Sequence, residues 1–468
     1  MSFSFARVFV AAAIGAASVI AVPPPAAAQA QVSGPAQAQS PGSTPEPTQA
    51  PALVPATDLA AASAQAPAAS APSAAATAPQ APAAPSLPVV GFQDGFFIQS
   101  ANGDNRLLFG VVSQLDGRFS LDDPKPTINT FTIRKVRPTL TGRVGRYFDF
   151  KVMPDFGTGT VVMLDAYVDL RFSPKFRVRT GKDKTPIGYE LLISDAYLLF
   201  PERSLASSLV PNRDIGVAVQ GDLAGNRVSY AGGVYNGIPD GISGTTDLDT
   251  NNAKVLAGRI VVYPFRDPKR PTSALSGLGF HVGGSTGKET GALPAFRTSV
   301  GQTYFSYATG AAASGNHTRV SPAVFYYYKG FGGYAEWMQS AQPVTRNAVE
   351  TDVTNQAWEV TGSYLLTGEA ASAGITRPKA AFDPANGKWG ALQLVARYTA
   401  LTVDDSVFRA SLAATGAVRD AKSFTIAANW YLNTYIKYYA TFERTTFGGS
   451  ATARPDENAI IFRTQLAF

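Results

Sequence analysis

Large apolar side chains alternate with polar or small ones along the last segment of the chain, residues 458–468. Ile460, Phe462 and Phe468 share one face of this segment, whereas Arg463 lies on the other. A period of two residues indicates a β-strand with two different faces. A soluble sandwich can show the same alternation, but a final strand ending on an aromatic residue is typical of a closed outer-membrane barrel. Phe468 therefore predicts a contact with the machinery that assembles such barrels.

Similar strands recur from residue 107 onward, with turn-forming residues between them. We predict an all-β fold, a transmembrane antiparallel β-barrel of about sixteen strands, an even number as a single-chain bacterial barrel requires. The predicted strands are 107–120, 130–144, 147–156, 162–173, 176–182, 213–223, 227–236, 254–264, 277–286, 318–329, 332–340, 357–367, 389–403, 421–432, 435–446 and 458–468.

Short and long connections between these strands alternate, which is the pattern of an outer-membrane barrel with periplasmic turns and extracellular loops. The predicted tight turns are 145–146, 173–175, 224–226, 329–331 and 432–434, and the long connections are 183–212, 237–253, 287–317, 341–356, 404–420 and 447–457. Two further connections, 265–276 and 368–388, are longer than a periplasmic turn should be. This parity places the 183–212 loop, the third, on the outer side.

The first 88 residues differ from the rest of the chain. Arg7 precedes an apolar run that ends at Val22, and small residues follow at 26–28, so residues 1–28 indicate a secretory signal peptide. Residues 29–88 consist almost wholly of Ala, Pro, Gln, Ser and Thr, which predicts a disordered periplasmic linker. A specific cell-wall or protein ligand for this linker remains an alternative. Residues 89–468 are left as the barrel domain.

Composition narrows the possible classes of protein. Zero cysteines exclude disulfides and thiolate chemistry, and two histidines, His281 and His317, argue against a histidine-rich metal site. The 19 Tyr and 28 Phe suit the aromatic girdles of a membrane barrel. Without Arg7, Glu46 and Asp58, residues 89–468 retain 39 basic against 32 acidic side chains. We expect no cofactor, no metal, no nucleic-acid partner and no enzymatic activity.

Three segments resemble the phosphate-selective porin O/P family. They read GKDKTPIGYE at 181–190 followed by PERS at 201–204 and PNRDIG at 211–216, YLLTGE at 364–369 followed by WGALQLVARY at 389–398, and RKVRPTLTG at 134–142 followed by FDF at 148–150. The similarity spans roughly residues 91–468. It implies a sixteen-stranded homotrimeric barrel, loops folded into the pore and anion selectivity. The chain departs from the family at Asp183, between two lysines, so a general anion preference is the firmer expectation.

A pore that passes anions needs cationic groups spaced along the path, and arginine suits this because its planar fork matches phosphate and keeps its charge. Apolar partners on each strand assign several cations to the lumen. These are Arg134, Arg137, Arg177, Arg179, Arg259, Arg397, Lys437 and Arg463. Lys135 falls out of this alternation, as a β-bulge would explain. Alternatively these cations only balance lumenal carboxylates such as Asp165, because lipid excludes charges from the outer face.

The third loop is the predicted constriction of the pore. Lys182, Lys184, Arg203 and Arg213 lie in or beside it. The segment 186–188, Pro-Ile-Gly, can turn the chain inward, and the apolar residues that follow suit a loop packed within a barrel. Glu202–Arg203 and Arg213–Asp214 are alternatively local salt bridges that hold the loop.

The preferred hypothesis is an outer-membrane diffusion channel with a preference for anions of the phosphate or polyphosphate type. Its expected partners are small anions such as phosphate, outer-membrane lipid and lipopolysaccharide. A general non-specific solute porin and a plugged structural or adhesive barrel remain alternatives. A barrel hydrolase is disfavoured because neither His281 nor His317 adjoins a nucleophile signature.

Overall fold

The computed structural model describes residues 87–122, 127–243, 249, 251–267, 269–270, 273–449 and 454–468. The predicted signal peptide and all but the last two residues of the predicted linker lie outside the described residues. Within the described part of the chain, no helix has both the length and the apolar character needed to cross a membrane.

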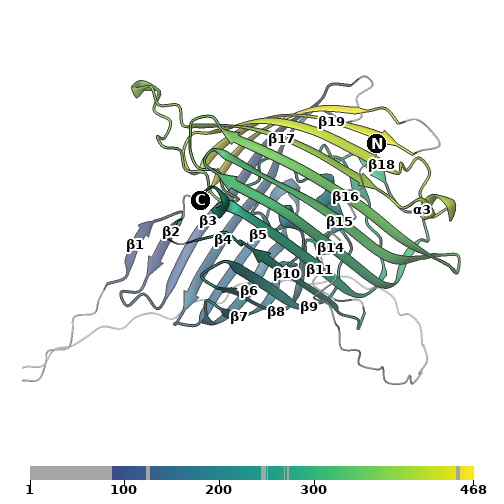
Figure 1. Ribbon diagram of the computed structural model, residues 1–468, viewed down its shortest axis with the longest axis horizontal. Helices are drawn as coiled ribbons and strands as arrows, with labels where there is room; N and C mark the ends of the chain where they lie inside the picture. Colours follow the sequence, from purple (N-terminus) through teal and green to yellow (C-terminus); the bar gives the residue numbers. More distant parts are fainter. Residues whose placement is uncertain are drawn as a thin grey trace, which may run out of the picture. The chain divides into compact units, whose positions relative to one another are not determined.

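Sixteen antiparallel strands form a closed barrel, in which each strand pairs with its neighbours in sequence and the last pairs with the first (Figure 1). The strands are β3 (Arg106–Ser120), β4 (Thr130–Val144), β5 (Phe148–Asp155), β6 (Val162–Ser173), β7 (Phe176–Lys184), β8 (Arg213–Leu223), β9 (Val228–Tyr235), β10 (Val255–Val262), β11 (Leu278–Gly291), β14 (Ala312–Tyr328), β15 (Phe331–Arg346), β16 (Val349–Leu365), β17 (Ala391–Thr402), β18 (Asp420–Tyr431), β19 (Ile436–Gly448) and β20 (Glu457–Ala467). The predicted fold class and strand number are confirmed.

The two faces of the barrel wall follow the alternation of the sequence. In β17, Leu392, Leu394 and Tyr398 are exposed on the outer face, whereas Gln393 and Arg397 are buried inside. The same pattern continues around the wall, because the outer face meets lipid and the inner face meets polar groups. Register between neighbours is therefore fixed by which side chains each environment accepts.

The strands differ twofold in length. β5, β9 and β10 have 8 residues each, whereas β14 and β16 have 17. A strand needs about 9–11 residues to cross a bilayer, so the wall around β14–β16 extends well beyond the membrane.

This extension changes one predicted connection. Residues 341–356 were expected to form a long loop, but β15 and β16 continue through them and meet at a two-residue turn of Asn347 and Ala348. Both turn residues have positive φ, 50° and 63°, as a tight hairpin requires. The strand signal was missed because this hairpin lies beyond the lipid, where its outer face no longer has to be apolar.

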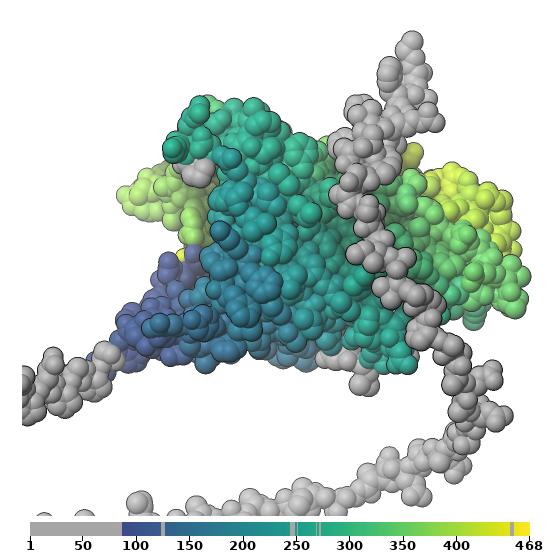
Figure 2. All heavy atoms as spheres, turned by 60° about the horizontal axis from the view of Figure 1, so that its bottom comes forward, coloured from purple at the N-terminus to yellow at the C-terminus, as the bar shows by residue number. Residues whose placement is uncertain are grey.

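An additional hairpin precedes the barrel. β1 (Val89–Phe92) pairs with β2 (Phe96–Gln99), and β2 pairs with residues 106–109 of β3. β20 pairs with β3 only from Val112 onward, so the hairpin takes the part of the β3 edge that β20 leaves free. Figure 2 shows it in purple, standing beside the blue part of the wall.

The connections between the barrel strands contain short elements. They are η2 (Gly157–Gly159), α2 (Tyr189–Leu192), η3 (Leu205–Leu209), η4 (Ala274–Gly277), β12 (Phe296–Arg297), β13 (Thr303–Phe305), η5 (Pro384–Asn386) and α3 (Asp405–Arg409). α2 and η3 belong to the third loop, and their apolar side chains form a core with the inner face of β15–β18. Leu209, Met338, Leu401 and Val407 in this core are fully buried.

Candidate functional site in the barrel lumen

The third loop, residues 185–212, folds into the barrel and is bonded to the wall through its main chain. Lys437 Nζ donates to the Leu198 carbonyl at 2.9 Å, and Asn429 Nδ2 donates to the Leu199 carbonyl at 2.8 Å. Gln465 Nε2 donates to the Ala196 carbonyl at 2.9 Å. These donors come from β18, β19 and β20, so polar side chains of the wall hold the loop across the lumen.

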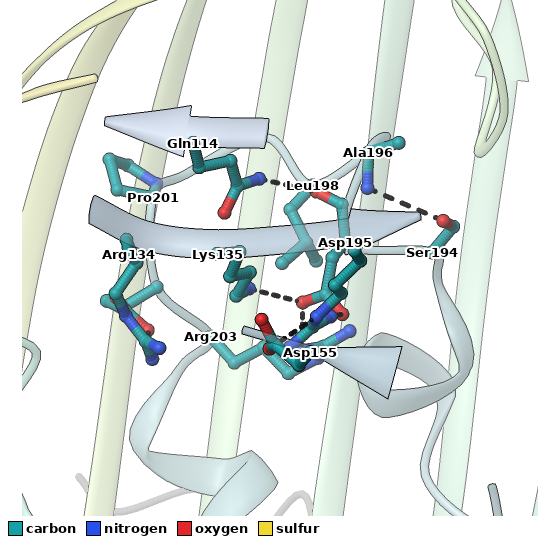
Figure 3. Close-up of polar contacts among 12 residues, drawn as sticks. Gln114, Arg134, Lys135, Asp155, Ser194, Asp195, Ala196, Leu198, Pro201 and Arg203 are labelled. Atoms are coloured by element: carbon teal, nitrogen blue, oxygen red, sulfur yellow. Dashed lines mark hydrogen bonds and ion pairs between the residues drawn. The ribbon is translucent and has the colours of Figure 1, made fainter. Parts of the chain in front are cut away.

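Asp195 lies at the centre of a group of cations from the wall and the loop (Figure 3). Its carboxylate accepts from Lys135 Nζ at 2.7 Å and from Arg203 Nη1 at 2.8 Å, and also contacts Arg137. Burial acts to raise the pKa of Asp195, but the three neighbouring cations hold this pKa well below its usual range. Asp195 is thus a fixed negative charge that ties the loop to β4.

Glu202 forms a second such centre near the far end of the loop. It accepts from Arg134 Nε at 2.7 Å and from Arg463 Nη2 at 3.3 Å, and it also pairs with Arg118. Burial again acts to raise the pKa of Glu202, and the arginines hold it well below its usual range. One loop carboxylate therefore joins β3, β4 and β20.

Glu190 in α2 forms the third centre, against β17. Its carboxylate lies 3.3 Å from Arg397 Nη1 and accepts from the Ser204 N–H and the Ser207 hydroxyl, both at 2.8 Å. Burial acts to raise the pKa of Glu190, and Arg397 with these donors lowers it. The three carboxylates together explain why an acidic residue recurs along a loop that enters a cationic lumen.

Most of the remaining predicted cations also have partners in the described structure. Arg213 Nε lies 2.6 Å from Asp165, and Arg179 Nε lies 2.7 Å from Asp169. Lys184 Nζ donates to the carbonyls of Leu191 and Ile193, at 2.6 and 2.8 Å. Arg177 lies 3.4 Å from Asp222.

Arg259 differs from the other predicted cations. Its Nε is buried without a hydrogen-bond partner, and no ion pair within the described residues involves its guanidinium. Arg297 in β12 is likewise without an ion pair among the described residues, although it is exposed. These two guanidinium groups are the cations most available to a passing solute.

Three cavities follow one another through the lumen, with volumes of about 690, 250 and 390 Å³. The outer cavity lies between the third loop and Arg297, the middle cavity runs along β5–β10, and the inner cavity reaches Phe468 at the short-turn end. The outer and middle cavities share Arg137, Asp195 and Arg213, and the middle and inner cavities share Lys151.

Cationic side chains outnumber carboxylates in the first two cavities. Eight Arg and Lys side chains line the outer cavity against three Asp and Glu, and six line the middle cavity against three. The loop carboxylates therefore neutralise only part of the positive charge.

The predicted cations divide according to these cavities. Those that line a cavity are Arg134, Arg137, Arg179, Lys184, Arg203, Arg213, Arg259, Arg397 and Lys437. Arg177, Lys182 and Arg463 line none of the three.

Three lining cations were not assigned to the lumen from the sequence: Arg118, Lys135 and Arg297. A shift in register between β3 and β4 pairs Gln114 with Lys135 and Leu115 with Ile133, which leaves Arg134 as the extra residue of a bulge. The bulge lets Arg134 and Lys135, although consecutive, both reach the loop. Arg118 carried a usable signal, because it alternates with the apolar residues of its strand, whereas Arg297 lies in a loop where no period exists.

His317 has hydrogen-bond partners like those of the catalytic base of a hydrolase, but it is buried where a substrate could not reach it. Its Nδ1 lies 2.9 Å from Glu289 and its Nε2 lies 2.7 Å from the Ser340 hydroxyl. All three side chains are buried, and the Ser340 hydroxyl already donates to Asp240. A nucleophile needs an open approach for its substrate, so this group acts as a structural network. Among the described residues, no group of three or more His, Asp or Glu side chains has an arrangement that could hold a metal ion.

Comparisons with known proteins agree with this architecture. The family model described as phosphate-selective porin O and P matches residues 112–468. Among proteins with curated descriptions, no sequence matches the chain.

Solved structures of outer-membrane channels share the fold. OmpT of Vibrio cholerae is 12% identical over 78% of this chain and 98% of its own, with a TM-score of 0.51. The outer membrane channel DcaP of Acinetobacter baumannii is 12% identical over 81% of this chain and 100% of its own, with a TM-score of 0.51. The anion-selective porin from Comamonas acidovorans is 11% identical over 78% and 100%, with a TM-score of 0.50. At such identities the likeness concerns the fold alone.

Proposed function

This chain belongs to the phosphate-selective porin O and P family of outer-membrane channels, and we propose that it passes small anions in preference to cations through the three lumenal cavities. The observation that carries the proposal is the surplus of cations, eight against three and six against three, along the outer and middle cavities. A surplus of one sign of charge in a low-dielectric channel raises the local concentration of the opposite ion. Membership of a family of channels excludes the barrel enzyme.

The anion preference is proposed to be general rather than strictly phosphate-selective. Strict selectivity needs several guanidinium forks free to replace the hydration of phosphate. In this lumen most forks already hold Asp195, Glu202, Asp165 or Asp169. We therefore expect phosphate to reduce the chloride current by occupying the pathway without excluding chloride from it.

The third loop is proposed as the constriction, because it separates the outer cavity from the middle one and bears residues of both. Lys184 and Arg203 would then act mainly by holding the loop, since the carbonyls of Leu191 and Ile193 occupy Lys184. Arg259 and Arg297 would set the selectivity.

The proposals on assembly rest on the family for the trimer and on the composition of residues 1–88 for the export signal and the linker. We propose a homotrimer in the outer membrane, a signal peptide at residues 1–28 that is removed on export, and a periplasmic linker at 29–88. Recognition of the final strand by the barrel assembly machinery remains a prediction.

Reversal potentials in planar bilayers under a KCl gradient test the proposal. We expect an anion-selective channel whose chloride current falls when phosphate is added. Arg259→Gln combined with Arg297→Gln should weaken the anion preference, because both cations face a cavity and neither holds the loop. Arg146→Gln is the matched control, since Arg146 is an exposed arginine in a turn, 3.3 Å from Asp104 and outside the cavities. Cation selectivity or a silent protein would overturn the proposal, and silence would favour the plugged barrel.

A further inference from the structure

The N-terminal hairpin presents one wholly apolar face. Register pairs Val90 with Ile98 and Ile98 with Leu107, which forms one row across three strands. Phe92, Phe96 and Phe109 form a second row in the same way. These six side chains are between 39% and 72% exposed. The hairpin precedes residue 112, where the match to the family model begins, so family membership assigns it no role.

This face continues the lipid-facing surface of the barrel. Leu107 and Phe109 lie on β3 at the same parity as Leu115, which is 51% exposed on the outer wall. Gln114 and Asp116, at the opposite parity, are fully buried inside the barrel. Residues that pair directly across neighbouring strands point to the same face of a sheet. The lipid-facing side of β3 is therefore also the side of Val90, Phe92, Phe96 and Ile98.

The hairpin is held in this orientation at its tip. The Phe92 and Phe96 rings each lie 5.8 Å from the ring of Phe468, and Phe92 lies 5.3 Å from Tyr435. Asp94 pairs with Arg377 at 2.8 Å, which ties the turn to the connection between β16 and β17. The C-terminal residue is itself fixed, since its N–H donates to the Val111 carbonyl at 3.0 Å. The apolar face therefore cannot turn inward to bury itself.

We propose that the β1–β2 hairpin is an embedded extension of the barrel wall whose outer face docks on acyl chains of the periplasmic leaflet. Six exposed apolar side chains in two contiguous rows are costly in water and favourable in hydrocarbon. The short-turn end, where the hairpin lies, is the periplasmic end of outer-membrane barrels. The opposite face suits an aqueous boundary, because Arg106 covers the Phe97 ring at 4.6 Å and Gln99 follows it.

Acyl chains are a better match than a second copy of the chain, because the apolar face of the hairpin is continuous with the lipid-facing surface of β3. The two rows run directly into the β3 surface that meets lipid, with no polar rim between them. A protein interface normally carries such a rim around its apolar centre.

Single cysteines test the proposal cleanly, because the chain contains none of its own. Phe96→Cys and Ile98→Cys place a bimane label on the outer face, and Gln99→Cys places it on the opposite face next to Ile98. Leu394→Cys on β17 serves as the lipid-facing reference. Each variant is purified full-length, checked for the heat-modifiable migration of a folded barrel, and inserted into vesicles of phosphatidylcholine with or without brominated acyl chains.

We expect brominated lipid to quench the labels at 96 and 98 as strongly as at 394, and to leave the label at 99 unquenched. Equal lack of quenching at 96, 98 and 99 would place the hairpin in water and overturn the proposal. Loss of quenching at 96 and 98 together with disulfide cross-linking between copies would also overturn it, in favour of a second copy. Conductance of the same vesicles is measured in parallel, so a failure here is distinguishable from a failure of the anion channel.

Discussion

The lumen has two unlike sides. Against β15–β18, the third loop packs through apolar residues such as Leu209, Met338 and Leu401. Along β5–β10, the loop leaves the middle cavity, lined by Arg179, Arg259 and other charged residues. One side therefore fixes the loop by excluding water, and the other keeps a hydrated path. A constriction needs both, because a loop held only by ion pairs in water would be weakly held.

The apolar side should dominate the stability of the loop. Leu209→Ala removes a fully buried side chain from the core and should cost about 3 kcal/mol. We expect a lower unfolding temperature in detergent and larger conductance fluctuations in bilayers, because the loop packs less firmly against β15–β18. Leu366→Ala, at an exposed position, is the control. Unchanged fluctuations would show that the apolar contacts do not hold the loop.

Removal of a loop carboxylate on the polar side should have the next largest effect. Glu202→Gln removes the negative charge that faces Arg118, Arg134 and Arg463. It should destabilise the contact at the far end of the loop by about 3 kcal/mol, as for a broken buried ion pair. The added positive charge should raise the anion preference. Reversal potentials and single-channel conductance measure both effects. A fall in anion preference would contradict the assignment of Glu202 to the lumen.

Acid should release the same contacts at an unusually low pH. Asp195 and Glu202 have folded-state pKa values well below their usual ranges. Such groups contribute stability that is fully present above the unfolded pKa of about 4 and is lost as pH falls through the lower folded value. Conductance fluctuations should therefore stay small from pH 7 down to about pH 4 and grow only below that pH. Conductance fluctuations that already grow near pH 6 would require a different titrating group.

The smallest effect is expected at Arg177. It was predicted as a pathway cation, yet it lines none of the three cavities and pairs with Asp222 in a partly exposed position. Arg177→Gln should change stability by less than about 1 kcal/mol and leave the reversal potential near that of the parent chain. A shift as large as that of Arg259→Gln would place Arg177 on the pathway after all.

The sequence predicted what depends on local periodicity. The inward direction of Arg397 and Arg463 follows from alternation with apolar neighbours, and both are buried inside the barrel. The inward loop followed from its apolar residues. By contrast, the short strands of the N-terminal hairpin give too few repeats to show a period.

The partners of the cations could not be predicted in the same way. Glu202 meets Arg134, Arg118 and Arg463, which are 68, 84 and 261 positions away in the chain. Such meetings depend on barrel closure, which no local pattern specifies, although the alternation did indicate the bulge beside Lys135. Hence no local pattern separates Arg259, which has no ion pair among the residues that the structure describes, from Arg179, which has two.

The unequal strand lengths have a consequence for how solutes arrive. Strands of 17 residues exceed a span of about ten by roughly seven residues, or about 18 Å of height at the usual tilt. The tight turn at 329–330 keeps β14 and β15 level at the other end, so we expect this excess to rise on the outer side at β14–β16, above a lower rim at β5–β10. The mouth is consequently slanted. We therefore expect solutes to enter from the side of the low rim at β5–β10, opposite the tall wall at β14–β16.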